Sequence, residues 1–291
     1  MPATTESTES IARRAVRVAR RGFRTLTVSA VATIAFAVSV IPAVAQQPGP
    51  LPVDQPPTSP EFFPRYNFQL AANSLSGGDP RFTWDAHFGG NADLVDYVKG
   101  RVSVVADYEA VLGSEFRAFD PNQGNYILET SASTWAGENE IAGVFHHVSR
   151  HISDRPKRYA IAWNILGARL LRKVDLGGLA SVAVIVGGGK VVQHADVDYQ
   201  WNANVDIVVR HAINRGVGVF AHGTGELFTV DPAIRGRTDT QHSGRFEGGV
   251  RFEGRGGALE LFAGVEHRLD ADPHDYLPVT WAVAGFRMVS K

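Results

Sequence analysis

The chain has 291 residues, a formal net charge of −1 and no cysteine. A near-neutral charge argues against a nucleic-acid partner, which selects a basic excess, and the lack of cysteine excludes disulfides and thiolate-bound metals. The mean hydropathy of −0.09 is low for a protein of membrane-spanning helices but ordinary for strands that alternate apolar and polar residues.

The N-terminal 45 residues have the layout of a secretory signal peptide. Arginines crowd residues 13–24, an apolar stretch runs from Leu26 to Ile41, and Ala43-Val44-Ala45 forms a cleavage pattern. A membrane anchor is the alternative, but the apolar run is shorter than the roughly 20 residues that a spanning helix needs. We therefore expect export by a removable signal peptide at 1–45. The Pro- and Gln-rich residues 46–64 are expected to form a periplasmic linker.

From residue 65 to the end of the chain, the sequence repeats with a period of two. Segments that alternate over ten or more residues are long for globular strands and suited to tilted membrane-spanning ones. The predicted strands are 65–75, 81–90, 99–112, 124–136, 139–150, 158–173, 179–192, 197–212, 216–230, 240–254, 257–269 and 276–288. The sequence thus predicts an all-β fold, a transmembrane antiparallel up-and-down β-barrel of about twelve strands at 65–291, located in the outer membrane.

The predicted connections alternate between tight turns and longer charged loops, as expected for the two ends of such a barrel. The first hairpin is expected to break this alternation, with a short outer loop and a longer inner one. Aromatic residues near the strand ends are expected to form an interfacial girdle: Tyr66, Trp84, Trp135, Tyr159, Tyr199, Trp281 and Phe286. Charged residues at the alternate strand positions, which face the inside of the barrel, are expected to fill a narrow lumen: Glu129, Asp198, Arg210, Arg245, Glu247, Arg251 and Glu260.

One cluster of residues has the pattern of a catalytic site. His147-x-Ser149 lies on one predicted strand and Asn164 on the next, and residues two apart on a strand share a face. This arrangement resembles the His-x-Ser pair and downstream Asn of outer-membrane phospholipase A, and it is similar to the His-x-Ser pair of lipid A 3-O-deacylases. The resemblance implies His147 as general base, Ser149 as nucleophile and Asn164 as the group that orients the histidine, on the outer wall of the barrel.

This sequence departs from the pattern of those hydrolases in two places. Both families have Asn directly after the serine, where this chain has Arg150, and the loop before Asn164 is three residues longer. At that spacing Asn164 need not lie opposite His147.

The longer run His147-x-Ser149-x-His151-x-x-Asp154 is more similar to that of an uncharacterised family of bacterial outer-membrane barrels. That resemblance implies fold and location only. A second interpretation of the same run is a metal site formed by His147, His151 and Asp154, holding a divalent cation such as Ca²⁺, because imidazole and carboxylate are reasonable ligands for such ions.

Two functions remain open from sequence. A non-enzymatic structural or narrow-channel role is favoured, and a serine hydrolase acting on phospholipid or lipid A is the alternative. The expected partners are outer-membrane lipids, lipopolysaccharide and the barrel-assembly machinery, with no nucleic acid, and the sequence leaves the oligomeric state open.

Overall fold

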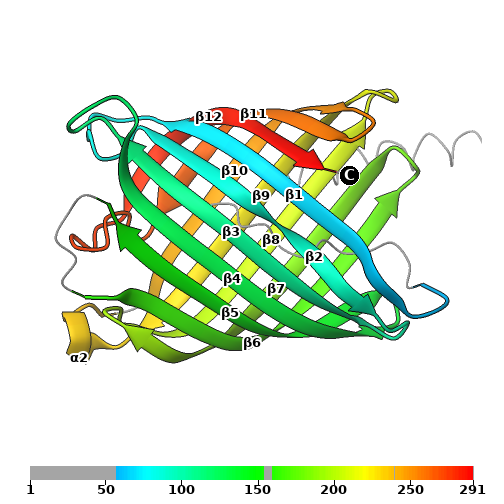
Figure 1. Ribbon diagram of the computed structural model, residues 1–291, viewed down its shortest axis with the longest axis horizontal. Coiled ribbons are helices and arrows are strands. Elements are labelled where there is room, and N and C mark those ends of the chain that lie inside the picture. Colours follow the sequence, from blue (N-terminus) through cyan, green and yellow to red (C-terminus); the bar gives the residue numbers. More distant parts are fainter. Residues whose placement is uncertain (1–56, 154–158, 239, 291) are drawn as a thin grey trace, which may run out of the picture. The chain divides into compact units, whose positions relative to one another are not determined.

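A computed structural model describes residues 57–153, 159–238 and 240–290, and these form a closed antiparallel barrel of twelve strands (Figure 1). Each strand pairs with its neighbours in the chain, and β1 pairs with β12 to close the wall. The predicted fold class is therefore confirmed. The predicted signal peptide and most of the predicted linker lie outside the described residues.

The barrel strands are β1 (Glu61–Leu75), β2 (Trp84–Asp96), β3 (Arg101–Gly113), β4 (Asp120–Ala136), β5 (Asn139–Ile152), β6 (Ile161–Leu176), β7 (Ala180–Ala195), β8 (Tyr199–Ala212), β9 (Val217–Val230), β10 (Thr240–Glu253), β11 (Gly257–Arg268) and β12 (Val279–Ser290). A short helix, α2 (Pro232–Arg235), lies in the connection between β9 and β10. No helix among the described residues is long and apolar enough to cross a membrane.

The connections define two different ends of the barrel. The short-turn end has the connections 97–100, 137–138, 177–179, 213–216 and 254–256, and the loop end has 76–83, 114–119, 153–160, 196–198, 231–239 and 269–278. The alternation of short turns and mostly longer loops is the one predicted from the sequence. It places the start of β1 and the end of β12 at the short-turn end.

The expected exception at the first hairpin was wrong. Strand β2 continues to Asp96, so its turn with β3 is short and the loop-end connection before it is the longer one. Gly89-Gly90-Asn91 looks like turn chemistry in sequence. In the barrel these glycines remain in the strand, paired with both β1 and β3. Glycine suits the position because a Cβ on Gly90 would lie 2.1 Å from the carbonyl oxygen of Asn67 on β1. After a β-bulge between Asp93 and Val95, β2 remains paired with β3 as far as Asp96.

Two residues assigned to the aromatic girdle are buried in the lumen instead, and a third, Trp135, lies on the lumen face opposite the buried Glu140. Tyr199 and Trp281 are only 3% and 2% exposed. Tyr199 stacks on Phe228, and Trp281 packs against Phe82. A register shift between Tyr199 and Trp201 explains the first case, because an extra residue there reverses the parity that the sequence pattern predicted for Tyr199.

The lumen is filled by ion pairs, as predicted. Arg287 contacts both Glu247 and Glu260, while Arg245 lies 2.9 Å from Glu247 and 3.2 Å from Glu266. The other predicted charges also face inward: Glu129, Asp198, Arg210 and Arg251. The carboxylates of these pairs are tolerated in the buried lumen because a guanidinium lies beside each of them.

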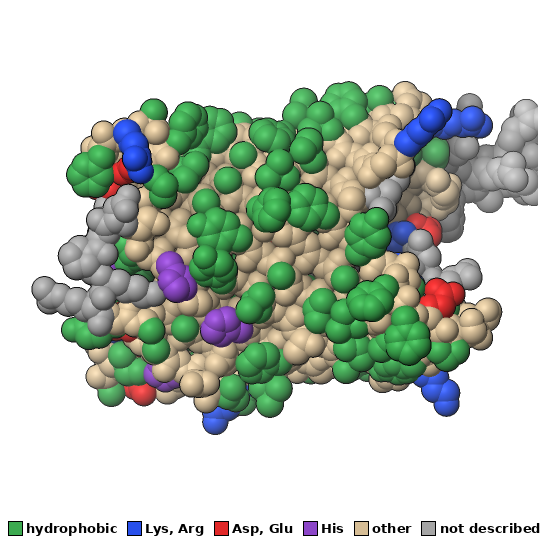
Figure 2. Space-filling view, in the orientation of Figure 1, with side chains coloured by type: hydrophobic (Ala, Val, Ile, Leu, Met, Phe, Trp, Pro, Cys, Tyr) green, Lys and Arg blue, Asp and Glu red, His purple; other side chains and the backbone are tan. Residues whose placement is uncertain are grey.

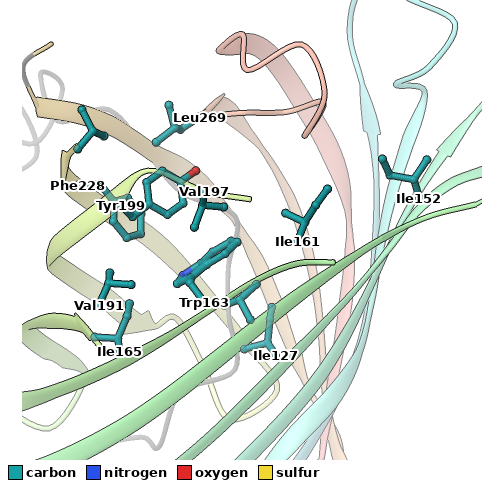
Figure 3. Packing of buried hydrophobic residues seen from close by; sticks show 12 residues of the cluster. Ile127, Ile152, Ile161, Trp163, Ile165, Val191, Val197, Tyr199, Phe228 and Leu269 are labelled. Atoms are coloured by element: carbon teal, nitrogen blue, oxygen red, sulfur yellow. The ribbon is translucent and has the colours of Figure 1, made fainter. Parts of the chain in front are cut away.

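The loop end of the lumen is closed by apolar side chains and by charged loops. One cluster gathers Trp163, Tyr199 and Val197 with other buried residues of β4–β9 and of the loops, including Leu269 of the connection 269–278 (Figure 3). Above it, Arg237 pairs with Asp198 at 2.5 Å and with Asp270 at 2.7 Å. Burial alone would lower the pKa of Arg237, but hydrogen bonds and attraction from the two carboxylates hold it above its ordinary value.

The outer wall carries many exposed hydrophobic side chains (Figure 2). They come from alternate positions of the strands, such as Phe88 on β2, Leu166 on β6 and Leu261 on β11. A continuous apolar outer surface over a polar, ion-paired interior is the inverse of a soluble domain and is the arrangement of transmembrane barrels.

Candidate functional site

The predicted catalytic residues lie on the outer wall, near the loop end of two adjacent strands. On β5, His147, Ser149 and His151 alternate with inward residues such as Val148, which is 5% exposed. Asn164 faces outward near the start of β6, between the inward Trp163 and Ile165. The alternation of the strand therefore presents all the predicted groups outside the barrel.

His147 and Asn164 are direct partners in the register of β5 and β6. The Nδ1 atom of His147 lies 2.6 Å from Oδ1 of Asn164. The two strands are joined by the connection 153–160. The length of this connection left open whether His147 and Asn164 face each other, and the structure brings them together.

A third polar residue, Gln193 on β7, continues this row across the wall. The side-chain amide of Asn164 donates to Oε1 of Gln193 at 2.9 Å. This contact turns the amide so that its oxygen faces His147. A register shift lies beside it, because Asn164 pairs with Gln193 while Ile165 pairs with Val191. Sequence reasoning missed Gln193, since a bulge that sets its position leaves no mark in a pattern of alternating residues.

Ser149 bonds to a different histidine from the one expected. Its Oγ lies 3.0 Å from Nε2 of His151, and no hydrogen bond among the described residues joins it to His147. The ring of Tyr126, opposite Ser149 on β4, packs edge-on against His151 with the centroids 5.1 Å apart. Ser149 thus lies between two histidines on one face of a strand, and it contacts His151.

Apolar side chains surround these polar groups. Tyr126 and Leu128 on β4, Phe145 on β5 and Leu166 on β6 are each 41–59% exposed on the same wall. Figure 2 shows histidine side chains among hydrophobic ones on this face, over the region of β4–β6. Behind the wall, Trp163 belongs to the buried cluster of Figure 3. Exposed apolar side chains therefore flank the polar row on the outer wall, and buried apolar side chains pack behind it.

The alternative metal site remains a prediction. His147 and His151 lie on the same face of β5, but Asp154 lies outside the described residues. Within the described part of the chain, one group of His, Asp and Glu side chains has ligand atoms within 4.8 Å of one another, and it is Asp85, His87 and Glu109 in the lumen.

Fold and site together define a twelve-stranded barrel of the transmembrane type whose outer wall carries two neighbouring polar pairs, His147–Asn164 and Ser149–His151. The sequence matches no protein-family model and no curated protein.

Solved structures share the architecture. Outer membrane phospholipase A from Escherichia coli has a TM-score of 0.48 and 11% identity, and the match covers 79% of this chain and 98% of that one. A dimer of the outer membrane phospholipase of Salmonella typhi with bound calcium gives 0.46 and 11%, covering 85% and 94%. LpxR from Salmonella typhimurium gives 0.43 and 9%, covering 76% and 99%. Likeness at such low values concerns the barrel architecture alone.

Proposed function

We propose that this protein is an outer-membrane serine hydrolase that cleaves acyl esters of membrane lipids on the outer wall of its barrel. The observation that carries the proposal is the hydrogen bond between Nδ1 of His147 and Oδ1 of Asn164, next to Ser149 and among exposed apolar side chains. An oriented histidine beside a serine hydroxyl is the arrangement that nucleophilic acyl transfer requires.

The hydrogen bond to Asn164 sets the protonation of His147. Because an amide oxygen only accepts, Nδ1 must carry the proton, and Nε2 is left with the lone pair of a general base. Gln193 supports this assignment by fixing the amide of Asn164. His147 is therefore the proposed base, Asn164 orients its ring, and Gln193 holds the amide of Asn164 in place.

The chemistry follows from these roles. A histidine removes the proton of Ser149 Oγ as the oxygen attacks the ester carbonyl carbon and forms a tetrahedral intermediate. Collapse of the intermediate breaks the bond to the alcohol oxygen, which takes the proton back from the imidazolium. Water then attacks the acyl-serine with the same histidine as base, releasing the fatty acid and restoring Ser149.

The surroundings of the site favour a lipid as substrate. Leu128, Phe145 and Leu166 give an acyl chain apolar contacts on the wall, while the ester group reaches the polar row near the loop end. Phospholipid and lipid A both present acyl esters at the membrane surface, so both belong in the test. A divalent cation such as Ca²⁺ remains part of the proposal as a charge to stabilise the oxyanion, and lipids and lipopolysaccharide are its proposed partners.

A narrow channel, the form of the non-enzymatic role that sequence left open, receives less support. The lumen holds buried ion pairs along its length, and its loop end contains the cluster around Trp163 and Tyr199. Conduction needs a water-filled path lined by polar groups. The wall site has an ordered hydrogen-bond pattern that a purely structural barrel does not require.

The proposal is tested by hydrolysis of phospholipid and lipid A with the full chain folded in detergent, with Ca²⁺ and with chelator. Fatty-acid release is expected from the wild type and from Ser74→Ala, a matched control that removes an outward serine of β1. Ser149→Ala should reduce the rate by about 10³-fold or more. Equal rates in Ser149→Ala and Ser74→Ala, or no release by the wild type under either condition, would refute the hydrolase.

A further inference from the structure

A second cluster of chemically competent side chains lies inside the barrel, away from the wall site. Asp85 and His87 project inward from β2, and Glu109 projects from β3 directly opposite His87. The three are 0%, 3% and 6% exposed. An imidazole and two carboxylates that converge in a buried space form a donor set suited to a divalent metal ion.

Two of the atoms that converge have no hydrogen-bond partner: Oδ1 of Asp85 and Nε2 of His87. The third, Oε1 of Glu109, makes no hydrogen bond but lies 2.8 Å from the guanidinium of Arg268. Buried polar atoms without partners are costly and uncommon in native structures. Two of them facing one point beside a carboxylate oxygen indicate a ligand that accepts lone pairs.

The spacing of these atoms fits a small metal ion. Nε2 of His87 lies 3.6 Å from Oδ1 of Asp85 and 3.9 Å from Oε1 of Glu109. Ligands at the usual Zn–N and Zn–O distances of about 2.0–2.2 Å stand roughly 3.4 Å apart around a tetrahedral ion. The two distances from His87 are therefore within about 0.5 Å of that spacing, and all three ligand atoms lie within 4.8 Å of one another.

The ring nitrogen of His87 that faces away from the cluster is hydrogen-bonded in the way common for metal-binding histidines. Nδ1 of His87 lies 2.8 Å from Oδ2 of Asp107, so the proton on this ring nitrogen is donated to a carboxylate. That hydrogen bond leaves Nε2 with its lone pair directed at the cluster, and a carboxylate behind the imidazole is the common support of zinc-binding histidines.

Both carboxylate ligands are held in place by neighbours. Arg268 donates to Oδ2 of Asp85 at 2.6 Å and lies 2.8 Å from Oε1 of Glu109, and Asn125 donates to Oε2 of Glu109 at 2.7 Å. Asp85 thus retains one oxygen for a metal, while Oε1 of Glu109 would be shared between the metal and the ion pair. A shared carboxylate oxygen remains a good ligand because it holds further lone pairs.

The charge balance of this region also calls for a cation. The carboxylates are Asp85, Asp107, Glu109 and Glu266, and the guanidinium groups that face them are those of Arg245 and Arg268. With a neutral His87, these four carboxylates face two guanidinium groups, of which Arg245 is shared with Glu247, so the cluster is net negative. A divalent ion supplies the missing charge.

Space for coordinating water is present beside the cluster. His87 and Glu109 border an internal cavity of about 60 Å³, which is large enough for water to complete the coordination. On the other side, toward the loop end, Phe82, Val111 and Trp281 form a buried apolar layer. An ion bound here would be shielded by this layer.

We infer that the lumen binds one divalent transition-metal ion, best matched by Zn²⁺, through Asp85 Oδ1, His87 Nε2 and Glu109 Oε1. The site is separate from the wall residues and does not depend on hydrolase activity. Its expected role is to fasten β2 to β3 in the interior of the barrel.

The inference is tested with the full chain folded in detergent, stripped with chelator and titrated with Co²⁺ and then Zn²⁺. The wild type should develop the visible absorption of low-symmetry Co²⁺ at one equivalent and lose it to Zn²⁺, and Zn²⁺ should raise its Tm. His87→Gln and Asp85→Asn should abolish both effects, and Asp107→Asn should weaken binding by about 10- to 100-fold.

The matched control is His222→Gln. His222 is also buried, with Asp206 and Glu247 beside it, but it lies outside the cluster. It should bind Co²⁺ as the wild type does, and heat-modifiable migration in gels will show which variants are folded. A wild type without stoichiometric binding would overturn the inference in favour of a protonated, ion-paired His87. Undiminished binding in both folded His87→Gln and folded Asp85→Asn would overturn it in favour of surface histidines.

Discussion

The imidazole of His147 on β5 and the amide of Asn164 on β6 face each other on the outer wall, with 2.6 Å between Nδ1 and Oδ1. A cross-strand pair of this kind is held by the backbone ladder rather than by a flexible loop. The histidine is therefore preorganised before any substrate binds, which is the condition for efficient general-base catalysis.

The two histidines beside Ser149 are expected to differ in importance. His147 has an orienting amide, while His151 contacts the serine and the ring of Tyr126. We expect His147→Ala to lower kcat by about 10³-fold, within the usual range of general-base catalysis, and His151→Ala to lower it by less than about 10-fold. Steady-state hydrolysis of a short-chain ester measures both.

The reverse ranking would identify His151 as the base. Ser149 would then react through the hydrogen bond seen here, and His147 with Asn164 would be a structural pair of the wall. His267→Ala is a suitable control, because His267 is another outward histidine with a side-chain partner, Thr280 on β12.

Gln193 is expected to act as a positioning residue. Gln193→Leu removes the acceptor that fixes the amide of Asn164, so kcat should fall by roughly 10-fold while KM stays near its wild-type value. Gln193→Glu keeps an acceptor oxygen at this place and should restore most of kcat. A loss in KM alone, or no rescue by glutamate, would show that Gln193 does not act through Asn164.

The lumenal ion pairs are expected to carry much of the stability of the barrel. Arg287 is 4% exposed and faces Glu247 and Glu260, so Arg287→Met leaves two buried carboxylates short of a partner. A loss of about 3–5 kcal/mol in the free energy of unfolding is expected, measured by denaturant titration in detergent.

A matched arginine on the surface shows the role of burial in this effect. Arg172 pairs with Glu138 near the short-turn end, where their side chains are 39% and 81% exposed. Arg172→Ala should cost under about 1 kcal/mol because solvent screens the pair. Similar losses in Arg287→Met and Arg172→Ala would contradict this description of the lumen.

The filled lumen also predicts an electrical property. The cluster around Trp163 and Tyr199 and the ion pairs of Arg237 occupy the loop end, so the protein in planar bilayers should show no steady stepwise conductance. Ohmic steps in the wild type would favour the channel role. Deleting the side chains of Trp163 and Tyr199 together should raise conductance if this cluster is the barrier.

Much of the fold could be predicted because apolar and polar residues alternate along each strand, and the polar positions are those that face the lumen. The strand order, the inward charges and the outward placement of His147, Ser149 and Asn164 all follow from parity. Parity fails where a bulge intervenes. This is why Tyr199 was assigned to the wrong face. The continuation of β2 was missed for a different reason, because Gly89-Gly90-Asn91 has the composition of a turn.

The pairing partners within the candidate site were harder to predict. Whether Asn164 meets His147 depends on the register across a connection whose length does not fix it, and Ser149 bonds to His151 through a choice of rotamer. The lumenal cluster is also a product of three-dimensional packing, since Asp85 and Glu109 approach only when β2 and β3 are paired.

The most direct test of the hydrolase is covalent labelling of Ser149 by a fluorophosphonate. The serine oxygen would form a bond to phosphorus and release fluoride, with the proton passing to a histidine. We predict a single labelled peptide containing Ser149, with labelling strongly reduced in His147→Ala and unchanged in Ser74→Ala. Wild-type protein that is folded but takes up no label, or takes it up elsewhere, would contradict the central claim.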